Sequence, residues 1–260
     1  MSRLYLYIVL CLYLSQLAFA QSTANKWSES IGDHSVGVHV STSRYCGDLS
    51  ERYNLAHLQF GWGIEGHYRY RFHERWCLMS DIGLYHIRAT QQYTKNAANQ
   101  LSFYATNFSV NTRVKWDMLS PEVGNLWNVF YLFGGVGATT LSPSTLLNNT
   151  VYSLPDFKTE GNEYALWAAQ VNYGLGFPMA LNKSTLLSIE GRYTHVRTDY
   201  LDDVSTVYVD KSASSELERN LADKRIAFGL PPNVIGATRG NPAKNDGYFL
   251  LTLQIIHKFR

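Results

Sequence analysis

The sequence predicts an all-β chain that folds as an eight-stranded antiparallel transmembrane β-barrel of the outer-membrane type. Three observations support this fold class. The first 20 residues have the pattern of a secretory signal, the chain is rich in aromatic residues (18 Tyr, 12 Phe and 6 Trp), and long segments alternate between polar and apolar side chains. An exported chain with this composition and no second apolar stretch long enough for a spanning helix is typical of an outer-membrane barrel.

The N-terminal segment has the features of a cleaved signal peptide. Arg3 gives it a basic start, an apolar run extends from Leu4 to Leu14, and Ala18-Phe19-Ala20 provides the small-x-small pattern of a cleavage site. We therefore expect removal of residues 1–20 and a single barrel domain over residues 21–260, placed in the outer membrane in contact with its lipid. The formal net charge of +2 gives no indication of a nucleic-acid partner.

The alternation is clearest in residues 57–72, where Glu65 and Arg69 lie on one parity and Ile64 and Tyr68 on the other. In a tilted membrane strand the apolar parity faces lipid and the polar parity faces the lumen. A soluble sandwich would show shorter strands, usually of about five or six residues. The same pattern predicts eight strands in all, at residues 34–45, 57–72, 76–90, 101–116, 128–141, 164–181, 185–197 and 247–259.

The connections between these strands alternate in length. The links at 72–76 and 181–185 are tight turns, whereas those around 48–56, 91–100, 142–163 and 198–246 are longer. Because barrels of this class have short periplasmic turns and long extracellular loops, the long links are predicted to face outward. The link at 117–127 is the exception, a longer connection on the periplasmic side.

Six charged residues fall on lumen-facing positions: Glu65, Arg69, Asp81, Arg113, Glu190 and Arg192. Side chains about fill the interior of an eight-stranded barrel, so these residues predict an internal ion-pair network rather than a pore or a catalytic site. A lipid-modifying barrel enzyme would need a nucleophile and a base within reach of each other. Ser188 and His195 lie on opposite parities of one strand and cannot converge, so no catalytic residue is predicted.

The longest connection, residues 198–246, is the predicted extracellular loop. It opens with TDYLDDVSTVYVD at 198–210, whose aspartates we expect to fasten the loop to the barrel mouth, with Arg239 and Lys244 as counter-charges. Clustered carboxylates can also bind Ca²⁺, but their spacing matches no calcium-loop motif, so no cofactor is predicted. Ser215 and Glu218 have the spacing of a capping box, which predicts a short helix within the loop.

Two cysteines remain after signal cleavage. Cys46 follows the first strand and is expected at the outer end, whereas Cys77 follows a periplasmic turn. A disulfide tolerates only about 7 Å between Cα atoms, so the two cannot bond to each other. Because the compartment is oxidising, we hypothesise that Cys77 pairs with a cysteine of a periplasmic partner; the alternative is a free, half-buried thiol.

Several segments carry a resemblance to a known family. RYCGDLS at 44–50, RTDYLDDVSTVYVD at 197–210, LERNLADKR at 217–225 and RGNPAKNDGYF at 239–249 resemble the Bacteroidetes outer-membrane barrel family that includes PorG, a component of the type IX secretion system. The resemblance covers essentially the whole mature chain. The loop positions that match the family motif are Asp199, Tyr200, Leu201, Asp202, Asp203, Arg239, Gly240, Asn241 and Pro242.

The resemblance implies a non-enzymatic subunit needed for protein export. Members associate with a periplasmic ring formed by the lipoprotein PorK and its partner PorN, which would give this chain a protein partner and no small-molecule substrate. The surfaces available for the ring are the periplasmic segments at 21–33, 72–76, 117–127 and 181–185. A lipid-modifying enzyme and a general structural or adhesive barrel remain as alternatives.

Overall fold

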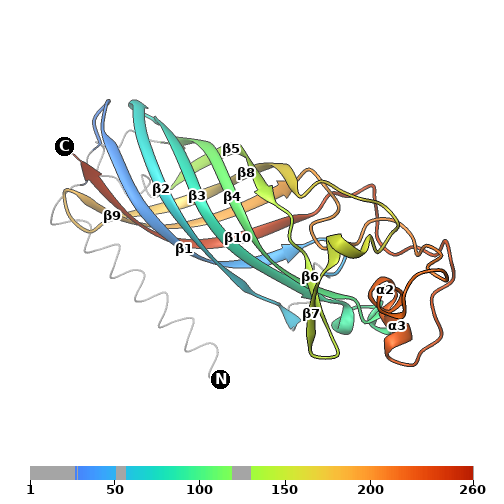
Figure 1. Ribbon diagram of the computed structural model, residues 1–260. Coiled ribbons are helices and arrows are strands. Elements are labelled where there is room, and N and C mark those ends of the chain that lie inside the picture. The colour runs from blue at the N-terminus through green and yellow to red at the C-terminus, as the bar shows by residue number, and fades with distance from the viewer. Residues whose placement is uncertain (1–26, 28, 51–56, 119–129, 260) are drawn as a thin grey trace, which may run out of the picture.

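A computed structural model describes residues 27, 29–50, 57–118 and 130–259 of the chain. Over these residues eight long strands pair antiparallel in sequence order and close into a ring (Figure 1). The expected fold class is confirmed. The barrel strands are β1 (His34–Cys46), β2 (Gly61–His73), β3 (Trp76–Thr90), β4 (Ser102–Asp117), β5 (Tyr131–Thr140), β8 (Trp167–Ala180), β9 (Thr185–Val196) and β10 (Gly247–Phe259).

Pairing of β1 with β10 closes the barrel. The register runs without a break from His34 opposite Phe259 to Cys46 opposite Gly247. Closure leaves no barrel strand with an unpaired edge, which is the condition for a sheet to cross lipid. The tight turns after β2 and β8 lie at the same end as the C-terminus, and the longer links after β3, β5 and β9 lie at the other end (Figure 1).

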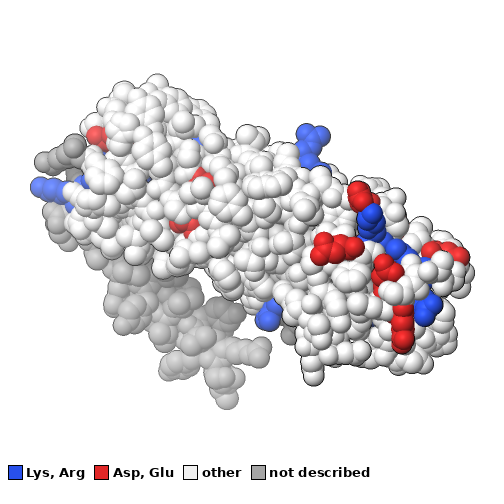
Figure 2. All heavy atoms as spheres, viewed as in Figure 1, with Lys and Arg blue, Asp and Glu red and all other residues white. Residues whose placement is uncertain are grey.

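Side-chain orientation follows the predicted alternation. In β1, Val38 and Val40 are 55% and 51% exposed on the outer surface, whereas His39 and Ser43 are each 1% exposed inside. Most of the charged side chains visible in Figure 2 gather at the end that carries the long loop, and few interrupt the wall of the barrel. This surface therefore suits a lipid environment, in which charged groups are costly.

Two expected strand starts are wrong by three residues or more. The second strand begins at Gly61 rather than at residue 57, and the sixth barrel strand begins at Trp167 rather than at residue 164. Tyr164 leaves the ladder because its hydroxyl donates to Asp203 Oδ1 at 2.8 Å in the long loop, where its ring stacks on Tyr200. The start proposed at residue 128 lies outside the described residues, as does the signal peptide.

A small hairpin occupies the link that was expected to be a plain loop at 142–163. Its strands are β6 (Ser144–Leu147) and β7 (Thr150–Ser153), and Ser144 pairs with Tyr104 of β4. Asn148 and Asn149 form the turn with φ of 48° and 61°. Two positive φ values in a two-residue turn suit Asn, so the sequence did contain a hairpin signal at this position.

The long loop folds into a compact layer over the barrel mouth, which we call the cap. It contains helices α2 (Glu216–Ala222) and α3 (Lys224–Ala227), at the end of the molecule opposite to the C-terminus (Figure 1). The predicted capping box is confirmed, because Ser215 Oγ accepts from Glu218 N and the Glu218 carboxylate accepts from Ser215 N. Other links contain the 3₁₀ helices η2 (Gln91–Tyr93), η3 (Ala97–Asn99) and η4 (Leu154–Phe157). None of the helices in the described ranges is long and apolar enough to cross a membrane.

The interior is divided into two zones. An apolar cluster fills the half beneath the cap, where Leu201 and Val204 of the long loop pack with Tyr45, Tyr85 and other barrel residues. Buried charged residues fill the other half, toward the short turns. The cap is thus held partly by ordinary apolar packing, and the charged zone lies below it.

Candidate functional site

The six residues predicted to face the lumen are all buried, each with 3% exposure or less. Arg113 links the two acids Asp81 and Glu190. Its guanidinium donates to the two Asp81 oxygens at 2.6 and 2.9 Å and to Glu190 Oε2 at 2.9 Å. Arg192 donates to Glu65 Oε2 at 2.6 Å, and its Nη1 lies 3.7 Å from Asp81 Oδ2. Five of the six residues therefore form one group in the middle of the lumen.

Arg69, the sixth residue, belongs to a second group near the short turns. Its Nη1 donates to Glu29 Oε1 at 3.1 Å, and Arg71 Nε donates to Glu29 Oε2 at 2.7 Å. Arg71 also contacts Asp117 at 2.8 Å, as does Lys115 at 2.8 Å. Glu29 precedes β1 and enters the lumen from below, a position that no local sequence pattern indicates.

Taken together, the two groups contain equal numbers of acidic and basic side chains. Five carboxylates face five basic side chains in the described part of the lumen: Glu29, Glu65, Asp81, Asp117 and Glu190 against Arg69, Arg71, Arg113, Lys115 and Arg192. Burying an unpaired charge is very costly, so pairing at this level is what a dry interior requires. The described part of the lumen is packed with buried, compensated charges.

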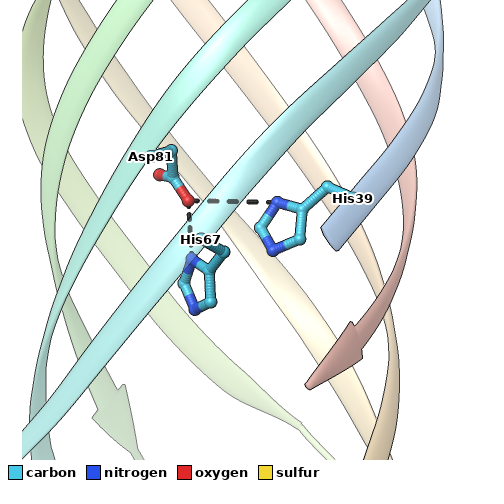
Figure 3. Close-up of side chains that lie close together, drawn as sticks. All are labelled: His39, His67 and Asp81. Atoms are coloured by element: carbon cyan, nitrogen blue, oxygen red, sulfur yellow. Dashed lines mark hydrogen bonds and ion pairs between the residues drawn. The ribbon is translucent and has the colours of Figure 1, made fainter. Parts of the chain in front are cut away.

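Three luminal side chains lie close enough to be compared with a metal site (Figure 3). His39, His67 and Asp81 place their nearest ligand atoms within 4.8 Å of one another. However, His67 Nδ1 is 2.7 Å from Asp81 Oδ1, which is a hydrogen-bond distance, and Arg113 already occupies both Asp81 oxygens. A metal ion would have to displace this guanidinium, so the geometry favours a histidine-lined ion-pair network.

Four family-motif residues, Asp199, Asp202, Asp203 and Arg239, meet side chains from other segments at the opposite end of the barrel. We call this group the mouth clasp: Tyr45, Asp48, Glu160, Asp199, Asp202, Asp203, Arg239 and Asp246. At its centre the Tyr45 hydroxyl lies 2.6 Å from Asp202 Oδ2 and 2.6 Å from Asp246 Oδ1. The backbone N–H of Asn241 donates to Asp48 Oδ2. The end of the first strand is thereby joined to both ends of the long loop.

Arg239 forms the second half of the clasp. Its Nη1 donates to Glu160 Oε1 at 2.9 Å, and its Nη2 lies 3.6 Å from Asp203 Oδ2. Glu160 also accepts from Ser205 N at 2.8 Å, a role that the sequence did not reveal. Arg239 is thus the counter-charge that we expected, whereas Lys244 is exposed and forms no ion pair with the loop aspartates within the described structure.

The other motif positions divide between clasp and surface. Leu201 is buried with 0% exposure, whereas Tyr200 and Asn241 are partly exposed and Pro242 is exposed. Gly240 is buried, and a Cβ there would lie 2.7 Å from Asp48 Oδ2, so this position favours glycine. Asp210, the last aspartate of the opening stretch, is exposed and accepts from Ser212 N in a turn.

Burial changes the acidity of the clasp carboxyls. It raises the pKa of Asp202, and repulsion from Asp246 adds to the rise. Burial likewise raises the pKa of Asp199 to about 8, with repulsion from Asp48 as the second cause.

The calcium alternative concerned the aspartates of the clasp. Within the described ranges, His39, His67 and Asp81 are the one group of three potential metal ligands whose atoms lie within 4.8 Å of one another, so the clasp aspartates are not preassembled as a calcium site.

The cysteines lie at opposite ends of the barrel, as their register positions require. Cys46 is opposite Gly247 at the cap end, and Cys77 is opposite Arg71 at the other end. Cys77 is 0% exposed rather than half-buried, and its thiol faces Glu29 Oε2 at 3.7 Å. A disulfide to a partner would therefore require Glu29 to leave the lumen first.

The positions considered for catalysis do not converge. Ser188 is buried and hydrogen-bonded to Tyr131, whereas His195 is exposed on the outer face of the same strand. His86 lies beside Trp62 on that outer face. Among the described residues no histidine ring is hydrogen-bonded to a serine hydroxyl, and the contact of Ser43 Oγ with His86 goes to the backbone carbonyl.

Comparison with known proteins agrees with this architecture. Residues 9–211 match the family model described as the outer membrane protein beta-barrel domain. The chain belongs to this family. As an outer-membrane barrel protein it uses the apolar outer face of its strands as the lipid contact and its packed interior as the core. Curated protein sequences give no match to the chain.

Solved structures similar to this outer-membrane barrel come from several bacteria. Neisserial surface protein A is 11% identical with a TM-score of 0.42, covering 87% of this chain and 97% of that one. Ail of Yersinia pestis is 12% identical with a TM-score of 0.45, covering 88% and 100%. OprG of Pseudomonas aeruginosa is 11% identical with a TM-score of 0.44, covering 91% and 99%. At these identities the similarity concerns the fold alone.

Proposed function

We propose that this protein is a non-enzymatic outer-membrane subunit of a type IX protein secretion system. In this role the barrel holds the periplasmic ring of PorK and PorN to the membrane. The observation that carries the proposal is the filled lumen, with five acids facing five basic residues below an apolar plug. A barrel whose described interior is filled by paired charges and apolar side chains acts through its outer surfaces, which is what an anchor does.

The mouth clasp supports the specific family. The segments on which the resemblance to the type IX barrel family rests are far apart in sequence, yet Asp48, Asp202 and Arg239 take part in one folded unit. Their contacts hold the cap to the barrel, so these positions serve a shared architecture rather than a catalytic site. The motif therefore supports membership of this family of structural barrels. It does not identify the binding partner.

The periplasmic end offers a polar contact surface for the ring. Residues 73–75 in the turn after β2 are exposed, and so is Lys183 in the turn after β8. Trp76 and Trp116 stack with ring centroids 6.1 Å apart next to this turn, where aromatic residues mark the membrane interface. Of the candidate link at 117–127, the structure describes only Asp117 and residue 118.

Crosslinking followed by purification from the native membrane tests this proposal. A variant with a minimal turn in place of residues 118–127 keeps Asp117, which the lumen needs for Arg71 and Lys115. We expect it to form a heat-modifiable barrel and to lose PorK and PorN. The matched control removes the β6–β7 hairpin at the cap end and should keep both partners. Unchanged recovery of the ring with the turn variant would count against an anchor at this link.

A general adhesive barrel is the second candidate, and one observation favours it. The cap exposes several large apolar side chains close together in sequence, with Phe228 at 61%, Val234 at 77% and Ile235 at 63%. Exposed apolar groups of this kind often mark a contact for another protein. Recovery of an extracellular partner and no ring component in the same crosslinking experiment would support this function instead.

A further inference from the structure

At the centre of the mouth clasp, the Tyr45 hydroxyl makes two short contacts with carboxyl oxygens but has only one proton to donate. The Tyr45 oxygen is 2.6 Å from a carboxyl oxygen of Asp202 and 2.6 Å from one of Asp246. Both distances are in the range of O–H···O hydrogen bonds, and each such bond contains one proton. A tyrosine hydroxyl carries a single proton and can donate it to one of the two acids. The other contact requires a proton on the carboxyl group.

The remaining oxygens of these two acids are already used. Asp202 Oδ1 accepts from Val204 N at 2.9 Å, and Asp246 Oδ2 accepts from Leu201 N at 3.1 Å. Both residues have 0% exposure, so solvent does not separate the carboxyls from the hydroxyl. The oxygens that face Tyr45 are therefore the place where an additional proton is held.

The charges around this centre are unbalanced, in contrast to the lumen. Asp48 and Asp199 add repulsion to the pair of acids. Lys224 and Arg239 line one small cavity with Asp202, but Lys224 donates to Ser102 and Thr145. No basic side chain forms an ion pair with any of the four aspartates in the described structure.

The other charges nearby are already engaged or distant. Arg239 is paired with Glu160 and Asp203. Lys244 is exposed and acts on Asp48 through space. Neutralisation of the central acids by a bound proton is consistent with this arrangement.

We propose that Tyr45, Asp202 and Asp246 form a proton-binding site that fastens the cap to the barrel and releases it when the proton is lost. In the closed state one carboxyl O–H donates to the Tyr45 oxygen, and the Tyr45 O–H donates to the other carboxylate. Loss of the proton to water removes one hydrogen bond and leaves two buried carboxylates on the same hydroxyl. Their repulsion separates residues 198–210 from the ends of β1 and β10.

The direction of the pH dependence follows from the acidity of the two carboxyls. Burial raises the pKa of Asp202 and of Asp246 above the usual value for aspartate. A group with a raised pKa in the folded state adds stability at low pH and loses it as the pH rises through that value. The cap is therefore closed at acidic pH and opens toward alkaline pH.

Hydrogen exchange of residues 198–210, corrected for the intrinsic pH dependence of exchange, tests the proposal in the full-length barrel in detergent. We expect slow exchange at about pH 6 and exchange about tenfold or more faster at about pH 9, as befits a lost hydrogen bond to a charged group. Asp202→Asn supplies a permanent N–H donor to Tyr45, so its exchange should rise much less between the two pH values than that of the wild type, with Asp199 as the source of the remaining response. Asp210→Asn changes an exposed aspartate of the same segment and should behave like the wild type.

Three results would overturn the proposal. The first is wild-type exchange that does not change between the two pH values. The second is a pH response that persists unchanged in Asp202→Asn and also in Asp246→Asn, which tests the other carboxyl if the first variant fails to fold. The third is loss of protection at about pH 6 when divalent cations are chelated, because a metal ion would then be the occupant.

Discussion

Replacement of Arg113 by methionine should destabilise the barrel strongly. Arg113 has 0% exposure, donates three hydrogen bonds to Asp81 and Glu190, and lies 4.5 Å from the centre of the Phe133 ring. Methionine keeps much of the apolar stem but leaves the two carboxylates without their shared partner. Removal of one member of a buried ion pair typically costs about 3–5 kcal/mol, and we expect the free energy of unfolding to fall by this amount.

Urea unfolding in detergent, followed by the heat-modifiable shift in electrophoresis, measures this change. Lys183→Met removes an exposed basic residue from a turn and should alter stability by less than about 0.5 kcal/mol. Adding Glu190→Gln to the Arg113 variant restores the balance of formal charge in the lumen. The double variant should then be more stable than the sum of the two single effects predicts, by about 0.5–3 kcal/mol. Strict additivity, or a loss below about 0.5 kcal/mol in Arg113→Met, would refute the reasoning.

Four further predictions concern other parts of the molecule. Gly47→Ala should make the cap sensitive to protease while the barrel still forms, because its Cβ would lie 1.9 Å from clasp oxygens; a cap as resistant as the wild type would contradict this. Glu29→Ala should speed maleimide labelling of the buried Cys77, and labelling at the wild-type rate would show that Glu29 does not cover the thiol. Ser215→Ala should weaken α2 by about 1 kcal/mol in local hydrogen exchange, through loss of its N-cap. Burial raises the pKa of Asp199 to about 8, so the cap should lose stability as the pH rises from about 4 toward that value; Asp199→Asn should flatten the profile, and an unaltered slope would exclude this group as its source.

The barrel strands were predictable because their signal is local. In a strand of a closed barrel, neighbouring residues face lipid and lumen alternately, so side-chain type records orientation directly. Residues such as Glu65 and Arg113 could be placed in the lumen from parity alone, and the structure buries both. The ends of strands were harder to place, since Tyr164 leaves its ladder for a partner in the loop.

The ion-pair partners could be predicted only in part. Parity places Arg69 in the lumen but does not say which acid it meets, and Glu29 precedes the first strand, where no alternation marks it as buried. The same limit applies to Glu160, which lies in a loop and becomes the main partner of Arg239. In both cases the contact depends on how a segment without regular structure returns to the barrel.

The number of barrel strands, the order of their pairing and the two faces of the wall could be predicted from the sequence, because these depend on a two-residue period and on link lengths. The partners of the aspartates in the mouth clasp became known only from the tertiary structure. Tyr45 is separated from Asp202 by 157 positions and from Asp246 by 201, and only closure of the barrel brings the first and last strands together. Two acidic residues without a local partner thereby become buried carboxyl groups on one hydroxyl. In the proposed site a bound proton neutralises part of their charge.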